Sequence, residues 1–273
     1  MSASDAVVEG ASQRRSQLRQ PRLAEVVASV LRERILDGQL GDGAELPKQD
    51  ELLDEFRISR PSLREALRIL ENEGLLTVRR GNVGGSVVEL PTAESSAYMF
   101  GLVLQSRRGT VAELAEAIHH IEPITASLCA QRIDRETTVL PVLRENIAAC
   151  EAAIHDAMQF TAIARAFHEQ LVEVCGNQTL ILMVGALESL WSEQERQWAL
   201  RAQSRGTYPG ENYRRDVLSA HKALVTAIAE GKAERAANLA RKHLQESQHY
   251  ALAEGSHQVV RATSMRSGFS RLS

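Results

Sequence analysis

Three arginines recur at the spacing of successive helical turns. Arg60, Arg64 and Arg68 stand at i, i+4 and i+8, and in a helix they would share one face. The apolar residues between them fall on another face: Leu63, Ala66, Leu67 and Leu70. The guanidinium fork of arginine can pair bidentately with O6 and N7 of guanine, or bind a phosphate. The pattern predicts a helix that packs on its leucines and offers its cations to the major groove.

The start of the same helix has the residues that a phosphate contact needs. Ser59 is a good N-cap, and Ser59, Ser62 and the free backbone N–H groups of the first turn can hold a phosphate. The alternative is an ordinary solvated arginine face on which Glu65 and Glu71 are the partners, as in most charge rows of this kind.

A glycine-rich basic segment follows the predicted helix. Arg79, Arg80 and Gly81, with Gly84 and Gly85, lie in RRGNVGG between two short apolar runs. Glycine lets a backbone approach a phosphate or a minor groove closely, whereas the plain alternative is a hairpin turn that needs positive φ angles. Two basic elements close together in sequence favour a DNA-binding role for both.

Three histidines lie on apolar stripes of the second half of the chain: His168, His221 and His243. If three helices turn these imidazoles inward, they can bind Zn, Ni or Mn. The alternative is three separate buried histidines, each with its own hydrogen bond, and the residues alone favour it because the three share no close spacing.

The charge is unevenly distributed. The formal net charge is −3, yet residues 57–85 contain six arginines and only three acidic residues. A basic stripe on a slightly acidic chain suits a nucleic-acid reader.

Composition and missing motifs exclude other classes. With 44% hydrophobic and 25% charged residues the chain is not generally disordered, and no apolar run approaches the ~20 residues of a membrane span. Its first residues have no hydrophobic core, so no secretory signal is expected. Three cysteines without a CxxC pair favour a cytoplasmic protein. We find no HExxH, nucleophile elbow, P-loop or nucleotide-binding glycine turn, and predict neither an enzyme nor an organic cofactor.

The elements that position the arginines are predicted to be three helices and a hairpin. Helices are expected over about 23–37, 48–56 and 60–73, and strands over 75–78 and 86–90. This order is that of a winged helix-turn-helix, so we expect a DNA-binding domain over 21–90, after a flexible arm at 1–20.

The remainder reads as amphipathic helix. A boundary at Pro91 and Thr92 begins an all-helical domain over 92–253, and the tail 254–273 is expected to be disordered. Its expected helices cover 93–105, 110–133, 138–156, 159–175, 178–204, 212–230 and 232–253. The predicted fold class is mainly α, with an antiparallel bundle of six or seven helices after the winged helix-turn-helix.

Residues 23–90 resemble the GntR family of bacterial regulators. The resemblance is carried by RERILDGQL, DELLDEF, ISRPSLREALRILENEGLL and VRRGNVGGSVV. It implies DNA contacts by Ser59, Arg60 and Arg64 and by the hairpin around Arg80 and Gly81. The chain departs from the family at Asp50, where an arginine is usual, and we expect Lys48 to compensate.

Residues 93–253 resemble, more weakly, the all-helical ligand-sensing (FCD) domain of the FadR-type branch. The carriers are IEP, AQR, FHEQLVEVCGNQTL and HKALVTAIAEGKAERAANLARKHL. Metal-binding members combine a D-x3-H pair with two later histidines, and His168, His221 and His243 match the three histidines. The aspartate position is Ala164, and an arginine often found near the effector carboxylate is replaced by Ile118. Three histidines can still hold a metal with water or an effector oxygen.

The sequence therefore predicts a transcriptional regulator of the repressor kind. We expect a homodimer on a palindromic operator in double-stranded DNA, controlled by a small-molecule effector such as an organic acid or acyl compound. The alternatives are a DNA-architectural protein without an effector, and a three-histidine metalloenzyme.

Overall fold

The chain forms two units, one on each side of Pro91 and Thr92. The computed structural model describes residues 23–78 and 85–262. The arm expected at 1–20, Arg79, Arg80, Gly81 and the last residues from 263 lie outside this described part.

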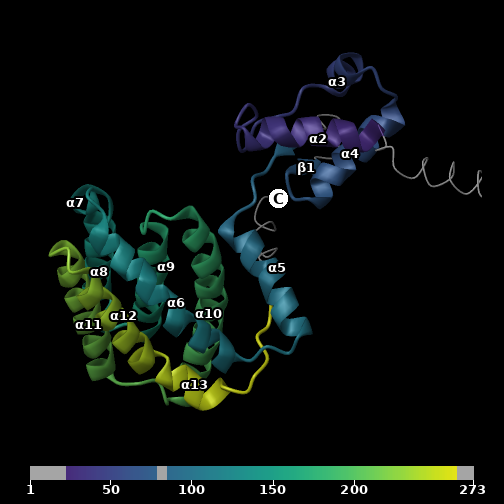
Figure 1. The fold of residues 1–273 in the computed structure, drawn as a ribbon. Coiled ribbons are helices and arrows are strands. Elements are labelled where there is room, and N and C mark those ends of the chain that lie inside the picture. Colours follow the sequence, from purple (N-terminus) through teal and green to yellow (C-terminus); the bar gives the residue numbers. More distant parts are fainter. Residues whose placement is uncertain (1–22, 79–84, 263–273) are drawn as a thin grey trace, which may run out of the picture. The chain divides into compact units, whose positions relative to one another are not determined.

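The first unit is a three-helix domain with a small hairpin (Figure 1). Helices α2 (Leu23–Leu36), α3 (Gln49–Phe56) and α4 (Arg60–Asn72) precede strands β1 (Leu76–Val78) and β2 (Ser86–Val88). The strands are antiparallel, with Leu76 opposite Val88 and Val78 opposite Ser86. This confirms the predicted winged helix-turn-helix.

Helix α4 begins and ends where its sequence predicts. Ser59 is extended, and its side chain accepts a hydrogen bond from the backbone N–H of Ser62 at 3.4 Å. Gly74 stops the helix with a φ of +75°, a left-handed conformation that glycine adopts without strain. Leu63, Ala66 and Leu70 are fully buried in the core of this unit. Their burial turns the arginine face of α4 away from that core.

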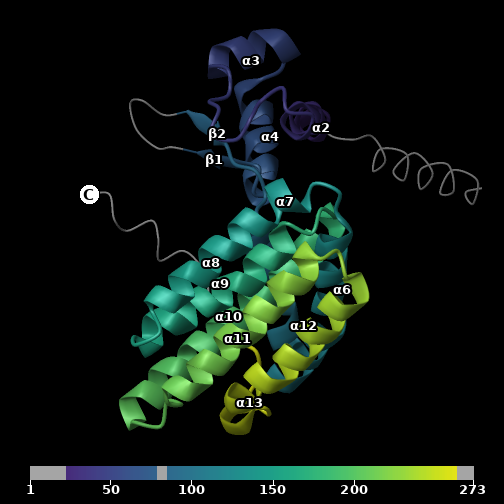
Figure 2. The same ribbon diagram turned by 90° about the vertical axis from the view of Figure 1, so that its left-hand side faces the viewer.

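The second unit is all helical within the described residues, and Figure 2 shows several of its long helices side by side. Seven helices have 13 residues or more: α5 (Ala93–Ser106), α6 (Val111–Gln131), α8 (Leu140–Ala152), α9 (Ala157–Glu173), α10 (Gln178–Arg205), α11 (Glu211–Ala229) and α12 (Ala233–Ser247). The sequence predicts no helix of its own for two short elements: α7 (Arg135–Thr138) lies largely between two predicted helices, and α13 (His249–Gly255) begins inside the span predicted over 232–253. Helix α6 packs against α9, α10, α11 and α12.

The tail prediction is wrong for residues 254–262. Helix α13 includes Glu254, and the chain after it returns to the loop between α5 and α6. There Val259 forms an antiparallel bridge with Thr110, and the N–H of Val260 donates to the carbonyl of Gly109 at 2.9 Å. Val260 is fully buried, so apolar contact fixes a segment that its polar neighbours suggested would be mobile. In the described ranges, no helix is both long and apolar enough to cross a bilayer.

Candidate functional site

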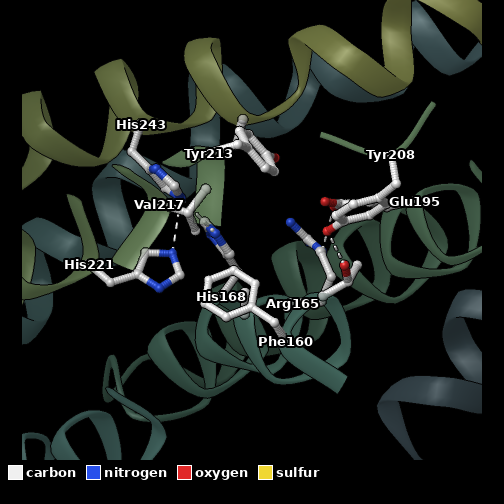
Figure 3. Close-up of a pocket in the computed structure, with 12 residues that line it drawn as sticks. Phe160, Arg165, His168, Glu195, Tyr208, Tyr213, Val217, His221 and His243 are labelled. Atoms are coloured by element: carbon white, nitrogen blue, oxygen red, sulfur yellow. Dashed lines mark hydrogen bonds and ion pairs between the residues drawn. The ribbon is translucent and has the colours of Figure 1, made fainter. Parts of the chain in front are cut away.

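Three helices bring the three histidines to one point inside the second unit. His168 lies on α9, His221 on α11 and His243 on α12, and each is at most 4% exposed. The Nε2 atom of His243 lies 3.0 Å from Nε2 of His221 and 3.3 Å from Nε2 of His168. Figure 3 shows the three rings converging. The predicted cluster is therefore present, although the sequence offered no close spacing.

The three histidines could hold a metal ion, because one ring nitrogen of each lies within 4.8 Å of those of the other two. Zn–N bonds of ~2.0–2.1 Å place two ligand nitrogens about 3.3–3.4 Å apart, close to the observed separations. Burial lowers the pKa of His168 to about 3, and it lowers the pKa values of His221 and His243 well below 6.5. The imidazoles are therefore neutral at neutral pH, which is the form that binds a metal.

A buried carboxyl group fixes the orientation of one imidazole. Oε1 of Glu122, on α6, lies 2.7 Å from Nδ1 of His168, and both groups are buried. When Nδ1 donates to this carboxyl group, Nε2 keeps its lone pair, as in carboxylate–histidine–metal arrangements. Phe167 stacks on the ring of His221, with centroids 3.9 Å apart. Packing and hydrogen bonding thus hold two of the three rings in place.

A buried group of charged residues adjoins the histidines. Arg165, on α9, donates to Oε2 of Glu188 at 2.5 Å, and its Nε lies 3.0 Å from Oε2 of Glu195. Burial, with the nearby Glu122, raises the pKa of Glu188 to about 8. Burial also raises the pKa values of Glu122 and Glu195. Burial lowers the pKa of Arg165 and the carboxylates raise it, with a net upward shift.

A cavity of about 20 Å³ lies between the histidines and this charged group. Its volume suits about one water molecule. Its lining comes from α9, α10, α11, α12 and the α10–α11 loop: Phe160, Thr161, Ala164, Arg165, His168, Glu195, Tyr208, Tyr213, Val217, His221, His243 and Ser247. Ala164, the position of the missing aspartate, is thus at the site. Ile118, which replaces the arginine usual in the family, does not line the cavity. It is fully buried in an apolar cluster with Leu114 and Trp191.

The sequence reasoning missed the charged residues of this site. The sequence predicts no role for Glu122, which lies in the IEP motif, or for Arg165, Glu188 and Glu195. A usable signal was present: Glu188 and Glu195 flank Trp191 at i−3 and i+4, on the face of α10 that the buried tryptophan marks. Burying a charged side chain costs free energy unless an ion pair or hydrogen bonds compensate it. Two glutamates on a buried helix face therefore indicate a buried polar site.

On the first unit, the three arginines of α4 are exposed but not equivalent. Arg60 donates to Oδ1 of Asp50 at 2.9 Å, and Arg68 makes two hydrogen bonds to Glu65, at 3.1 and 2.9 Å. Arg64 has no hydrogen bond or ion pair with any described residue. The alternative of a solvated arginine face thus describes Arg68, whereas the side chain of Arg64 is unpaired within the described part of the chain.

The two serines lie at the start of the arginine helix α4, and Lys48 directly precedes α3. The hydroxyl groups of Ser59 and Ser62 are 2.9 Å apart at the start of α4. Lys48 is exposed directly before α3, and its backbone N–H donates to Glu51 at 3.1 Å. Asp50 lies in the first turn of α3, so the departure from the family pattern puts a carboxylate beside Arg60.

Two family models match the chain, one in each unit. Residues 23–85 match the model of bacterial regulatory proteins of the gntR family, and residues 113–246 match the FCD domain. The first match covers α2, α3, α4 and β1, and it ends directly before β2. The second begins in α6 and ends in α12, so it contains all three histidines.

Curated relatives and a solved structure agree with these matches. An HTH-type transcriptional repressor NanR from Klebsiella aerogenes is 29% identical over 171 residues, which are 62% of this chain and 64% of that protein. NanR from Cronobacter sakazakii is 28% identical over 68% of this chain and 70% of its own length. The Streptococcus agalactiae GntR structure has a TM-score of 0.64 at 23% identity, over 83% of this chain and 99% of that one, and so shares the fold. The chain belongs to the gntR family of bacterial regulatory proteins, with an FCD domain as its helical unit.

Proposed function

We propose that this protein is a sequence-specific DNA-binding transcriptional regulator whose FCD domain senses a small molecule. The matching model of the first unit describes bacterial regulatory proteins, and the curated relatives are named transcriptional repressors. The observation that carries the proposal is the exposed Arg64, which pairs with no residue of the described ranges and lies on a helix whose opposite face is buried.

Helix α4 is the proposed recognition helix. A recognition helix enters the major groove with its N-terminal residues foremost. Arg60, Arg64 and the capping pair of Ser59 and Ser62 are all in or next to the first two turns of α4. In this proposal Arg64 contacts a base, while the serines and the first backbone N–H groups contact phosphate. Lys48, Arg79, Arg80 and Gly81 would add contacts to the backbone or the adjacent groove.

The NanR relatives are named repressors, and we propose repression for this protein. A homodimer would place two copies of α4 about 34 Å apart, one turn of DNA, on a palindromic operator. We propose that the protein is cytoplasmic, because bacterial DNA lies in the cytoplasm.

The histidine cluster is proposed to hold one divalent metal ion, Zn, Ni or Mn. His168, His221 and His243 would be its ligands, with Glu122 orienting His168. When bound, the ion supplies a buried Lewis acid with a coordination position open to an oxygen ligand. The cavity between the histidines and Arg165 is the proposed position of the effector, an organic acid or acyl compound.

Binding to the promoter of its own gene and to random DNA, over several salt concentrations, tests the regulator proposal. A specific regulator binds the promoter ~10³-fold or more tightly than random DNA, and both affinities fall as salt rises. Equal affinity for both DNAs at every salt concentration would identify an architectural protein instead.

A further inference from the structure

Arg165 is a buried cation that faces the same cavity as the three histidines. It stands three residues before His168 on α9, and its side chain is only 8% exposed. In Figure 3 its guanidinium group points into the space between the histidine cluster and Tyr208. Burying a guanidinium group costs free energy unless its N–H groups donate hydrogen bonds. Any N–H group that has no acceptor in the protein is therefore available to a ligand.

The hydrogen-bond donors of Arg165 are only partly used. One terminal nitrogen donates to Glu188 at 2.5 Å. Nε lies 3.0 Å from Oε2 of Glu195, but its N–H forms no hydrogen bond of normal geometry. Among the described residues, the second terminal nitrogen has no hydrogen-bond acceptor either. A planar fork with spare donors, held by packing inside a cavity, is the arrangement that recognises a carboxylate.

The two acidic partners of Arg165 differ in their access to the cavity. Glu195 lines it, whereas Glu188 does not. Glu195 also accepts a hydrogen bond from the indole N–H of Trp191 at 3.1 Å, and this bond gives it an alternative partner. An incoming carboxylate would therefore compete with Glu195 for Nε and leave the bond to Glu188 intact.

The rest of the cavity wall suits the remainder of a small organic acid. Ala164, one residue before Arg165, presents only a methyl group to the cavity. Thr161 and Tyr208 pair their hydroxyl groups at 2.6 Å on another part of the wall. The present volume of about 20 Å³ accepts little more than one or two heavy atoms, so larger acids require side-chain movement.

We propose that Arg165 is the anion-recognising residue of the FCD cavity and that it binds the carboxylate of the effector. This inference rests on the proposed sensing function. One carboxylate oxygen would accept from Arg165, while the other faces the metal position defined by the three histidines. The recognised chemical class is a monocarboxylate or dicarboxylate; neutral amides and alcohols of the same size would bind weakly.

The test is carboxylate binding by the whole protein loaded with one equivalent of Zn²⁺. Acetate, propionate and succinate are titrated by calorimetry and by thermal shift, with acetamide as the uncharged probe. Wild-type protein should bind at least one of the acids and not acetamide. Arg165→Gln should weaken that affinity tenfold or more. The affinity of Arg165→Lys should lie between those of wild type and Arg165→Gln. Arg196→Gln, which removes an exposed arginine of α10, should leave the affinity unchanged.

Removal of Arg165 leaves two buried carboxyl groups without their cation, so a second variant protects the test from misfolding. Glu195→Gln removes the competing charge and keeps the cation, and it should raise carboxylate affinity severalfold. The proposal is overturned if wild-type protein binds none of the three acids, if folded Arg165→Gln binds them as well as wild type does, or if Glu195→Gln has unchanged or weaker affinity. DNA binding measured without any acid tests the regulator proposal separately.

Discussion

The Nε2 atoms of His221 and His243 lie 3.0 Å apart, although the two residues belong to different helices and are buried together. Nε2 of His168 is 3.3 Å from that of His243. A single shared proton can link two imidazole nitrogens but leaves the third without a partner. One divalent cation can satisfy all three lone pairs, and this requirement underlies the predictions for the cluster.

Metal content should depend on His221. Wild-type protein is expected to contain one divalent ion per chain, and His221→Ala should contain almost none after dialysis. Elemental analysis by mass spectrometry measures both. His249→Ala removes an exposed histidine outside the cluster and should leave the metal content unchanged. Equal metal content in wild type and His221→Ala, including none in either, would contradict the metal proposal.

Glu122 should raise metal affinity without touching the metal. Glu122→Gln keeps the shape of the side chain but weakens the hydrogen bond that holds Nδ1 of His168. Loss of such an outer partner costs about 10–100-fold in metal affinity. Competition with a fluorescent zinc chelator measures the change. Glu116→Gln, an exposed substitution on the same helix, is the matched control, and equal affinities of the two variants would rule out a positioning role for Glu122.

The pH dependence of stability should carry the signature of neutral buried histidines. Burial places the pKa of His221 well below the 6.5 of an unfolded chain. Its contribution to the free energy of unfolding is therefore complete above pH 6.5 and is lost as pH falls toward the folded pKa. Glu188 acts oppositely: its pKa of about 8 removes stability as pH rises from 4.5. The slope of the wild-type free energy of unfolding against pH therefore combines both effects.

A comparison of variants isolates the histidine. In chelator, between about pH 5 and 6, the free energy of unfolding of His221→Gln should change with pH less steeply than that of wild type, by about 1.4 kcal/mol per pH unit. Urea unfolding at several pH values gives both slopes. The cavity left by the substitution shifts the whole curve but not its slope, so identical slopes would show that His221 is protonated in the folded protein.

Arg64 should be the most important of the three arginines for DNA binding. Arg64→Ala should cost ~1–3 kcal/mol on the cognate site and relax the base preference there, because its side chain has no competing partner in the described residues. Arg68→Ala should matter less, since Arg68 already pairs with Glu65. Fluorescence anisotropy on cognate and mutated operators measures the effects. Unchanged binding by both Arg60→Ala and Arg64→Ala would remove α4 from the groove.

The sequence predicted α4 well because local rules decide it. The Ser59 cap, the buried Leu63 and Leu70 and the left-handed Gly74 are all short-range signals, and each is confirmed. The histidine cluster needed the family resemblance, because no local rule brings α9, α11 and α12 together. The partners of Arg165 come from another helix, 23 and 30 positions farther along the chain, and only packing reveals them. Val260 was missed because a short apolar pair in a polar tail gives no periodic signal.

Asp50 should restrain DNA binding through Arg60. Their ion pair, at 2.9 Å, joins two largely exposed side chains, so it contributes little to the stability of the fold. The pair does engage the guanidinium group of Arg60, and the carboxylate of Asp50 adds a negative charge near the predicted phosphate contacts. Asp50→Asn should therefore raise DNA affinity several-fold on cognate and random DNA alike, most strongly at low salt. Arg60→Ala in the Asp50→Asn background should remove most of the gain, as anisotropy titrations of the four proteins can show. A loss confined to the cognate operator would instead mean that the carboxylate itself reads a base, as an acceptor for the N4 amino group of cytosine.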